Sequence, residues 1–414
     1  MRILTITSNH PPYHSGGYEL RIKDIMDGLA ARGHQVLVLS TEAQPGSRKR
    51  PEISEYPVKR LLHNRYAAKF FPKEVLFDLI DTKTLERIIK KFHPDVIYLG
   101  HTYILSKAIM PYLADQILPI VYDEGGTCLK GAWTERGRWF DFTGDYQSRW
   151  VLLNKIKPFV TKLVVFLSNG RIKPHWRWPQ QMRVFFNSQS SLAHSLSFGV
   201  PVHNAEVIHS GIVLEKFPFL PRTKMEEPIK ILCPGRLEPR KGQLDAIKLI
   251  SILAAAGIQA ELTLVGETPS QSFLEQIKGK IKSVGFEESV RISGMVSQKE
   301  LAELYQKSDI CFFSSHQSAG FSRTPLEAMA SGCLVITFGC EGSSEIIADS
   351  VNGFIIEPDG VEQAVGIINL LSSHPVVFKN FVIDARIFVE KKFTFESYIE
   401  AIESFLLEKI GVKN

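Results

Sequence analysis

Two cations five residues apart form the strongest candidate for binding chemistry in this sequence. In the stretch PGRLEPRKGQ, Arg236 follows an apolar run that predicts a strand, and Lys241 stands at the start of the next predicted helix. Open α/β sheets bind ligands at the carboxyl ends of their strands, where both side chains would lie. Two cations beside a helix N-terminus suit a diphosphate. A solvated basic turn is the alternative, and it fits Arg240 better than either of these residues.

A carboxylate behind a glycine-containing loop forms the second candidate. In SSHQSAGFSRTPLEAMASGC a predicted strand ends in a loop, and a helix begins at Pro325, a residue favoured in the first turn. Glu327 lies in that turn, where it either complements the helix dipole or points into the crevice and accepts hydrogen bonds from sugar hydroxyls. A second loop-to-helix junction follows in GCEGSSEI, where Gly342 and Ser343 lead to Glu345.

The first strand-to-helix loop, SNHPPYHSGGYE, is a weaker candidate for anion binding. It puts Gly16 and Gly17 where unpaired backbone N–H groups and the positive end of a helix favour a negative charge. A tight turn that requires glycine is the alternative. The spacing is not G-x-G-x-x-G, so Glu42 after the second strand does not indicate a nicotinamide enzyme.

Strands and helices alternate along most of the chain, which is typical of a parallel sheet covered on both faces. In the first half we expect strands in RILTITS, HQVLVLST, DVIYLG and PIVYDE, with a helix over 19–32. A second series of alternating strands and helices begins at residue 229, after the linker KFPFLPRTKMEEP, which is rich in proline and charged residues. From there we expect strands in IKILCPG, AELTLVGE, VRISG, ICFFSS, LVITF and FIIEP, with helices between most of them.

These patterns predict two doubly wound α/β domains. The first spans 1–215 and carries an insertion at 125–187, and the second spans 216–395. The tail, 396–414, has a helical apolar stripe that can pack on either domain, and we expect it to return to the first.

The composition is that of a globular protein and excludes several classes. The chain has 414 residues, of which 44% are hydrophobic and 22% charged, so disorder, collagen and coiled coils are not expected. Five cysteines include no C-x-x-C pair, which argues against a disulfide framework and a zinc site. The most apolar stretch, VLLNKIKPFVTKLVVFL, is interrupted by three lysines and a proline, so we expect no spanning helix and a cytoplasmic protein.

The window 125–187 concentrates the basic charge of the chain. It holds eleven Lys and Arg against three Asp and Glu, together with all five tryptophans. This composition suits a surface lying in an anionic membrane interface, which predicts a peripheral association with the inner face of the membrane. An insertion whose aromatic side chains only pack on the first domain is the alternative. Nucleic acid is not an expected partner.

Taken in this order, the three motifs in the second domain resemble glycosyltransferase family 4, retaining enzymes of the GT-B fold. The resemblance implies two facing Rossmann-like doubly wound α/β domains with a deep interdomain cleft. The family's G-R-x4-K-G pattern, which clamps the donor diphosphate, corresponds to Arg236 and Lys241. Its E-G-F-G-x-x-x-L-E pattern corresponds to AGFSRTPLE, so the ribose-binding glutamate is Glu327, while Ala319 and Ser322 replace the first glutamate and the second glycine.

The resemblance also assigns residues of the first domain. His101, in YLGHTY, corresponds to a histidine near the anomeric centre in relatives, although a packed or capping histidine is the alternative from the sequence alone. The family's His-Asp pair appears as Tyr122-Asp123. The complete set of candidates is Arg236, Lys241 and His101 for catalysis; Gly16, Gly17, Gly266, Gly320, Phe321, Ser322 and Glu327 for the donor; and Asp123 and Glu124 for the acceptor side.

The implied activity is transfer of a sugar, with retention of configuration, from a nucleotide-diphosphate donor to a glycan or lipid-linked acceptor in cell-surface polysaccharide or glycolipid synthesis. No D-x-D pair is present to hold a metal, so we expect a reaction without metal or other cofactor. A front-face departure is favoured over double displacement by Asp123 or Glu124. The alternatives are a catalytically impaired sugar-nucleotide-binding homologue, because Ala319 removes a usual donor contact, and a nucleotide-sugar epimerase.

Overall fold

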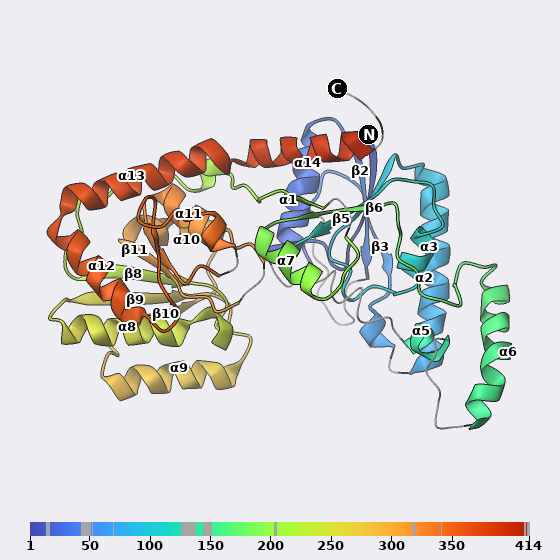
Figure 1. The fold of residues 1–414 in the computed structure, drawn as a ribbon, viewed down its shortest axis with the longest axis horizontal. Coiled ribbons are helices and arrows are strands. Elements are labelled where there is room, and N and C mark those ends of the chain that lie inside the picture. Colours follow the sequence, from blue (N-terminus) through green and yellow to red (C-terminus); the bar gives the residue numbers. More distant parts are fainter. Residues whose placement is uncertain are drawn as a thin grey trace. The chain divides into compact units, whose positions relative to one another are not determined.

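The computed structural model describes residues 1–13, 17–42, 51, 53–68, 70–125, 138–143, 151–202, 205–317, 320–340, 342–409 and 411. Two compact units make up the chain (Figure 1). The N-terminal unit comprises Met1–Asn187, Leu192–Ile208 and Ile399–Asn414, and the C-terminal unit comprises Ser188–Ser191 and His209–Tyr398. The sequence placed the main boundary between 215 and 216 and the start of the tail at 396.

The N-terminal unit is built on a seven-stranded parallel sheet with the order β3-β2-β1-β4-β5-β6-β7. Its strands are β1 (Arg2–Ile6), β2 (Gln35–Thr41), β3 (Val58–Leu62), β4 (Val96–Leu99), β5 (Ile120–Glu124), β6 (Met182–Phe186) and β7 (Glu206–Val207). Its helices are α1 (Gly17–Ala31), α2 (Phe71–Phe92), α3 (Ile109–Leu113), α5 (Arg138–Thr143), α6 (Val151–Leu167), most of α7 (Gln189–Ser197) and most of α14 (Phe395–Lys409).

The C-terminal unit contains a six-stranded parallel sheet with the order β10-β9-β8-β11-β12-β13. Its strands are β8 (Ile229–Pro234), β9 (Ala260–Val265), β10 (Val290–Gly294), β11 (Ile310–Phe313), β12 (Leu334–Thr337) and β13 (Phe354–Ile355). Its helices are α8 (Gln243–Ala255), α9 (Gln271–Val284), α10 (Gln298–Lys307), α11 (Thr324–Ser331), α12 (Val361–Ser373) and α13 (Pro375–Lys392). Short 3-10 turns occur at Arg65–Ala67, Leu214–Lys216, Pro239–Lys241 and Ser343–Glu345.

In each sheet the first strand along the chain lies inside the sheet, and later strands are added on both sides of it. Each sheet therefore has a switch point, where two strands that are not consecutive in the sequence lie side by side. In the first sheet this point lies between β1 and β4, and in the second between β8 and β11. Ligands of doubly wound sheets bind outside the carboxyl ends of the strands at this point. The loops that carry His101 and Arg236 therefore begin at the switch points.

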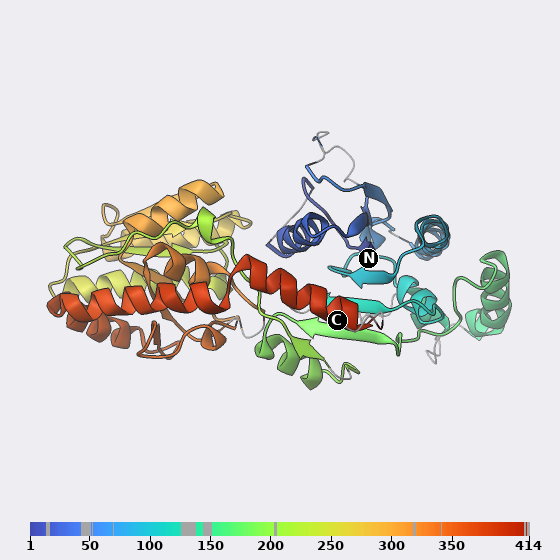
Figure 2. The same ribbon diagram turned by 90° about the horizontal axis from the view of Figure 1, so that it is seen from above.

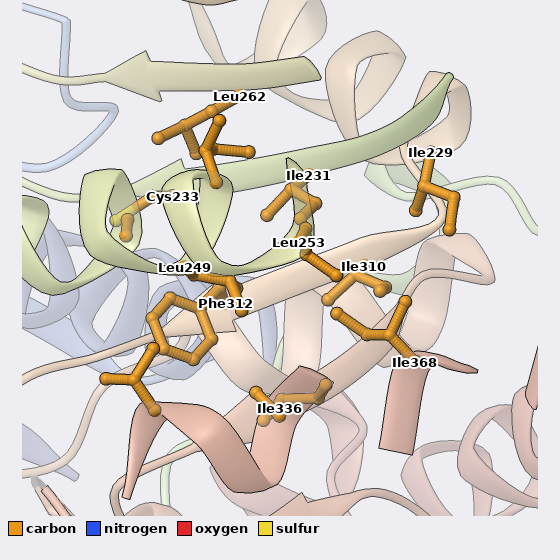
Figure 3. Packing of buried hydrophobic residues seen from close by; sticks show 14 of the residues in the cluster. Ile229, Ile231, Cys233, Leu249, Leu253, Leu262, Ile310, Phe312, Ile336 and Ile368 are labelled. Atoms are coloured by element: carbon orange, nitrogen blue, oxygen red, sulfur yellow. The ribbon is translucent and has the colours of Figure 1, made fainter. Parts of the chain in front are cut away.

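A continuous apolar core holds the second sheet to its helices. Figure 3 shows Ile231 and Ile310 on neighbouring strands, with Leu253 of α8 and Ile368 of α12 among the side chains around them. These side chains are at most 1% exposed. The strands of this unit are apolar in continuous runs because both faces of the sheet are covered, and that is why the sequence predicts them well.

Helix α2 and strand β3 have no counterpart among the elements expected from the sequence. The face that α2 buries carries Leu85 and Ile88 but also polar side chains, including Glu74, Asp78 and Asp81. These polar residues interrupt the apolar stripe that usually reveals an amphipathic helix. In Figures 1 and 2 this long helix lies along the first sheet.

The described part of the window 125–187 corrects the interpretation of its tryptophans. Trp139 is 1% exposed and its indole N–H donates to the carbonyl of Lys173 at 2.8 Å. Trp178 is buried in the core of the unit and Trp176 is half-buried against it. These three side chains pack inside the N-terminal unit and do not form the interfacial surface expected of them, while Trp133 and Trp150 lie outside the described residues.

In the described part of the chain, no single helix is long and apolar enough to cross a membrane. Helices α12 and α13, bent by 110° at their junction, pass the test of length and composition only as a pair.

Candidate active site

The loop after β8 is closely packed against the loop after β9. Gly266 has φ of 154°, and a Cβ atom built there would lie 2.0 Å from the carbonyl oxygen of Gly235. Glycine is therefore required at 266 so that the two loops can approach at the carboxyl edge of the sheet. Gly266, a donor-binding candidate, thus lies next to the backbone from which Arg236 extends.

Arg236 and Lys241 both lie at this edge. The guanidinium of Arg236 is partly exposed and pairs with Glu238 at 2.9 Å and with Glu267 at 3.6 Å. Lys241 ends the turn Pro239–Lys241, directly before α8. The N-cap residue of α8 is Gly242, which makes no side-chain hydrogen bond to the first turn of the helix. The start of α8 therefore lies beside these two cations without a side-chain cap from its N-cap residue. Arg236, Lys241 and the start of α8 thus lie at the carboxyl edge of the sheet, where the sequence placed its candidate anion site.

The loop after β11 fixes the position of the Lys241 loop. Ser314 Oγ donates to the carbonyl of Gly242 at 2.9 Å, and the backbone N–H of His316 donates to the carbonyl of Arg240 at 2.8 Å. Gly242 has φ of 71°, and a Cβ atom there would lie 1.9 Å from the carbonyl oxygen of Ser314. The two loops on either side of the switch point therefore form one packed platform.

His316 has a partner that the sequence did not indicate. Its Nε2 lies 2.8 Å from Oδ2 of Asp245, in the first turn of α8. Ala319 lies outside the described residues, and in the structure the His316 ring is engaged with α8. The only local signal for this pair was an aspartate in a first helical turn.

Glu327 lies in the first turn of α11 and is 9% exposed. The hydroxyl of Tyr305 donates to its Oε2 at 3.3 Å. Burial, followed by the nearby Glu327 charge, raises the pKa of Tyr305 well above its usual range, so this phenol remains a donor. Tyr305 thereby orients the carboxylate.

Gly320, Phe321 and Ser322 form the turn before α11. The carbonyl of Gly320 accepts from Ser188 Oγ at 2.8 Å, and its N–H donates to Ser191 Oγ at 3.1 Å. Phe321 packs beside Phe393, and Ser322 is half-buried. The donor-binding candidates of this turn are thus held by the short segment Ser188–Ser191, which belongs to the C-terminal unit.

Glu345 has a structural role that the sequence did not reveal. It accepts hydrogen bonds from the backbone N–H groups of Gln189 and Ser190, at 2.8 and 3.1 Å, and it lies 2.7 Å from Nε2 of His209. Burial raises the pKa of Glu345, but these hydrogen bonds outweigh that effect, so the pKa lies below its ordinary value. The ionised carboxylate caps the first turn of α7.

In the N-terminal unit, His101 follows β4 and lies at the switch point. Its Nδ1 is 3.4 Å from Oε1 of the buried Glu19, and its ring packs against Tyr18. Gly17 begins α1 and is exposed, whereas Gly16 lies outside the described residues. His101 and the first turn of α1 therefore meet at one edge of the first sheet.

The structure does not support Asp123 and Glu124 as acceptor-side residues. Both side chains are fully buried. The two carboxylate oxygens of Asp123 accept hydrogen bonds from Arg21 at 2.6 Å and from Tyr98 at 2.7 Å. Burial raises the pKa of Asp123, and the Arg21 charge opposes the shift. Because both oxygens are engaged in the interior, Asp123 stabilises the unit and is not poised to attack a substrate.

No group of three or more His, Cys, Asp or Glu side chains that could hold a metal ion occurs among the described residues. Of the described candidate residues, those of the N-terminal unit are Gly17, His101, Asp123 and Glu124, and those of the C-terminal unit are Arg236, Lys241, Gly266, Gly320, Phe321, Ser322 and Glu327.

Two doubly wound parallel sheets, each with a switch point, place this chain in the class of Rossmann-like α/β proteins. The model for glycosyl transferases group 1 matches residues 221–386, and the model for Glycosyltransferase Family 4 matches residues 15–161. This chain belongs to the group 1/family 4 glycosyltransferases. The resemblance read from the motifs is thereby confirmed, and membership argues against the epimerase alternative.

Two curated relatives illustrate the range of the family. The amylovoran biosynthesis glycosyltransferase AmsK of Erwinia amylovora is 30% identical over 204 residues, which cover 48% of this chain and 49% of that protein. This match thus spans about half the length of the relative. The glycogen synthase of Mycobacterium tuberculosis is 25% identical over 382 residues, covering 87% of this chain and 83% of that enzyme.

Solved structures show that the fold is GT-B. Sucrose-phosphate synthase from Thermosynechococcus elongatus superposes with a TM-score of 0.72 at 16% identity, covering all of both chains. Anabaena HepE in complex with UDP-glucose gives a TM-score of 0.67 at 19% identity, covering 99% of this chain and all of that one. The predicted fold class of two Rossmann-like domains is confirmed.

Proposed function

We propose that this chain transfers a sugar from a nucleoside-diphosphate donor to a glycan or lipid-linked acceptor, with retention of configuration. The observation that carries the proposal is the platform at the second switch point, where Arg236, Lys241 and the uncapped N-terminus of α8 share one edge. The complex of HepE with UDP-glucose supports a nucleotide-sugar donor. The name of AmsK supports a role in polysaccharide synthesis.

In this proposal the chemistry on the donor side is electrostatic. Negative charge develops on the diphosphate as the bond to the sugar breaks, and Lys241 with the N–H groups of α8 stabilises it. Arg236 exchanges its contacts with Glu238 and Glu267 for phosphate oxygens. Glu327, oriented by Tyr305, accepts hydrogen bonds from donor hydroxyls.

Retention is assigned to a front-face departure. The acceptor hydroxyl attacks the anomeric carbon from the side on which the diphosphate leaves, and a diphosphate oxygen receives the hydroxyl proton. Double displacement requires a free carboxylate, whereas Asp123 is buried and doubly hydrogen-bonded. His101 is assigned to the neighbourhood of the anomeric centre by the family resemblance.

Replacing Lys241 tests the donor site. Lys241→Ala should lower turnover at saturating donor about a hundredfold, because one fixed charge on the leaving group is lost. Lys248→Ala is the matched control, since Lys248 lies on α8, the helix that follows Lys241, but pairs with Glu362 at the surface. Transfer is followed with a panel of UDP, GDP and ADP sugars, and NMR of the product reports its anomeric configuration. Near-normal turnover of Lys241→Ala would refute the clamp, and an inverted product would refute retention.

The same assay tests metal independence. EDTA should leave the rate unchanged, because Arg236 and Lys241 supply the charge that a metal supplies elsewhere. Loss of activity on chelation, restored by Mg²⁺ or Mn²⁺, would contradict this part of the proposal.

A catalytically impaired sugar-nucleotide-binding homologue is the second candidate function. The observation that favours it is Ala319, which stands where the family carries a glutamate. Such a protein would be stabilised by a nucleotide sugar in a thermal-shift experiment but would neither transfer nor hydrolyse it with any acceptor. Ala319→Glu distinguishes the two: it should restore activity to an impaired homologue, but change donor preference in an active enzyme.

A further inference from the structure

Helix α6 leaves a row of large apolar side chains uncovered. Phe159 is 69% exposed and Phe166 is 80% exposed. With three further exposed residues they form what we call the apolar row, which consists of Ile156, Phe159, Leu163, Phe166 and Leu167. At 100° per residue these five positions fall within an arc of about 100°, so they share one side of the helix. A soluble surface rarely leaves so many large apolar side chains together.

The neighbouring side of α6 packs against the rest of the N-terminal unit. Val160 and Val164 pack against the buried cluster that contains Trp139 and Ile172. Figures 1 and 2 both show α6 at the outer side of the N-terminal unit, beside α5. The helix is therefore anchored through one side, and the apolar row is presented on another.

The stretch of sequence that contains the row carries charge of one sign. Between residues 146 and 205 the sequence contains no aspartate or glutamate and eight Lys and Arg, at positions 149, 155, 157, 162, 171, 173, 177 and 183. Lys162, on α6 itself, is exposed. At 100° per residue its position lies next to one edge of the apolar row. Arg171 and Lys173 beyond the helix pair with Glu86 and Asp115 from elsewhere in the unit. The helix itself thus combines apolar surface with positive charge only.

We propose that the apolar row of α6 inserts into the interface of an anionic lipid bilayer, with Lys162 at the level of the headgroups. A helix of 17 residues is about 25 Å long and would lie parallel to the surface. A bilayer is the partner that fits, because a helix with bulky apolar side chains, a flanking lysine and no acidic residue is complementary to acyl chains beneath anionic headgroups. The membrane contact expected from the window 125–187 is thus assigned to α6, and not to the three described tryptophans, which pack inside the unit.

The inference concerns a surface outside the donor site and does not rest on the proposed activity. Cosedimentation of the full chain with phosphatidylcholine vesicles, with and without phosphatidylglycerol, tests it. The wild-type chain should bind the anionic vesicles at low salt and lose binding as salt rises. The double variant Phe159→Ser/Phe166→Ser should lower the partition coefficient about tenfold or more, and Lys162→Gln should lower it by a smaller factor.

Phe70→Ser is the matched control, because Phe70 is also a phenylalanine exposed on the N-terminal unit but lies before α2. It should leave binding unchanged. Thermal unfolding of each variant reports whether the fold is retained. Negligible binding of the wild-type chain to anionic vesicles, or equal binding of the double variant, would overturn the proposal. If a second copy of this chain covers the row instead, sedimentation would show a dimer that the double variant abolishes, and vesicle binding would be absent.

Discussion

Two carboxyl groups inside the N-terminal unit have different environments. Asp123 has a buried cation, Arg21, at 2.6 Å, and such a pair is costly to break from one side. Asp78 accepts a hydrogen bond from Ser106 but has Glu74 as a like-charged neighbour. Burial, with Glu74 adding to it, raises the pKa of Asp78 to about 8. Asp78 therefore remains protonated at neutral pH, and Asp123 is paired.

The raised pKa of Asp78 has a predictable effect on stability. Between the ordinary pKa of 3.8 and about 8, the folded state holds a proton that the unfolded state has lost, so stability falls as pH rises through this range. Asp78→Asn should raise the free energy of unfolding at pH 7 by on the order of 1 kcal/mol. It should also flatten the dependence on pH between 4 and 8 on the same grounds.

Denaturant titrations of the wild-type chain and of Asp78→Asn at several pH values measure this effect. Asp384→Asn, an exposed aspartate on α13, is the control and should change nothing. A variant that is less stable than the wild type at pH 7 would show that Asp78 is ionised and stabilised in the fold.

At the scale of elements, charged contacts attach α14 to the turn between α1 and β2. Glu403 lies 2.7 Å from Nε of Arg32 and 2.7 Å from Nε2 of His34. Burial raises the pKa of Glu403, but the hydrogen bonds from His34 and Arg32 outweigh it, so the pKa lies below its ordinary value of 4.5. The ionised side chain thus stabilises the docked helix.

Because the folded pKa is lowered, the contribution of Glu403 is fully present above about pH 4.5 and is lost as pH falls through the folded value. Glu403→Gln should destabilise the chain at pH 7 by about 1 kcal/mol, and this effect should disappear once the pH is below the folded pKa of Glu403. Hydrogen exchange within α14 should increase in the variant. Unchanged exchange in α14 would mean that apolar contacts alone, such as those of Ile402 and Phe405, hold the helix.

At the scale of the whole molecule, the two units have separate hydrophobic cores. One centres on the first sheet and includes Ile97 and Tyr122, and the other centres on the second and includes Ile231 and Phe312. A ligand that binds one unit stabilises that unit by mass action, by about 2.7 kcal/mol at a hundred times its dissociation constant.

UDP should therefore protect the C-terminal unit selectively. Hydrogen exchange is expected to slow in β8, α8 and α11, and to change little in β1 and β2 of the N-terminal unit. GDP and ADP are compared in the same way, and the nucleotide with the strongest protection identifies the donor base. Protection confined to the N-terminal unit would place the nucleotide on the wrong sheet and contradict the assignment of Arg236 and Lys241.

Much of the C-terminal unit could be predicted from the sequence. Its strands are continuous apolar runs, and helices begin at recognisable first turns, as at Pro325. The diphosphate candidates, Arg236 and Lys241, were found because a short stretch of sequence holds both the end of a strand and the start of a helix. Information of this kind is local, since periodicity, turns and caps depend on neighbours within one or two turns of chain.

Only the tertiary structure decided which side chains are covered and what they contact. Trp139 and Phe159 both belong to the same basic, aromatic stretch of sequence, but Trp139 lies in the core and Phe159 on the surface. Asp123 became a buried partner of Arg21, and Glu345 a cap for α7, through contacts 102 and more than 150 residues apart. Burial and pairing depend on which distant segments pack together, and the residue types alone do not carry that information.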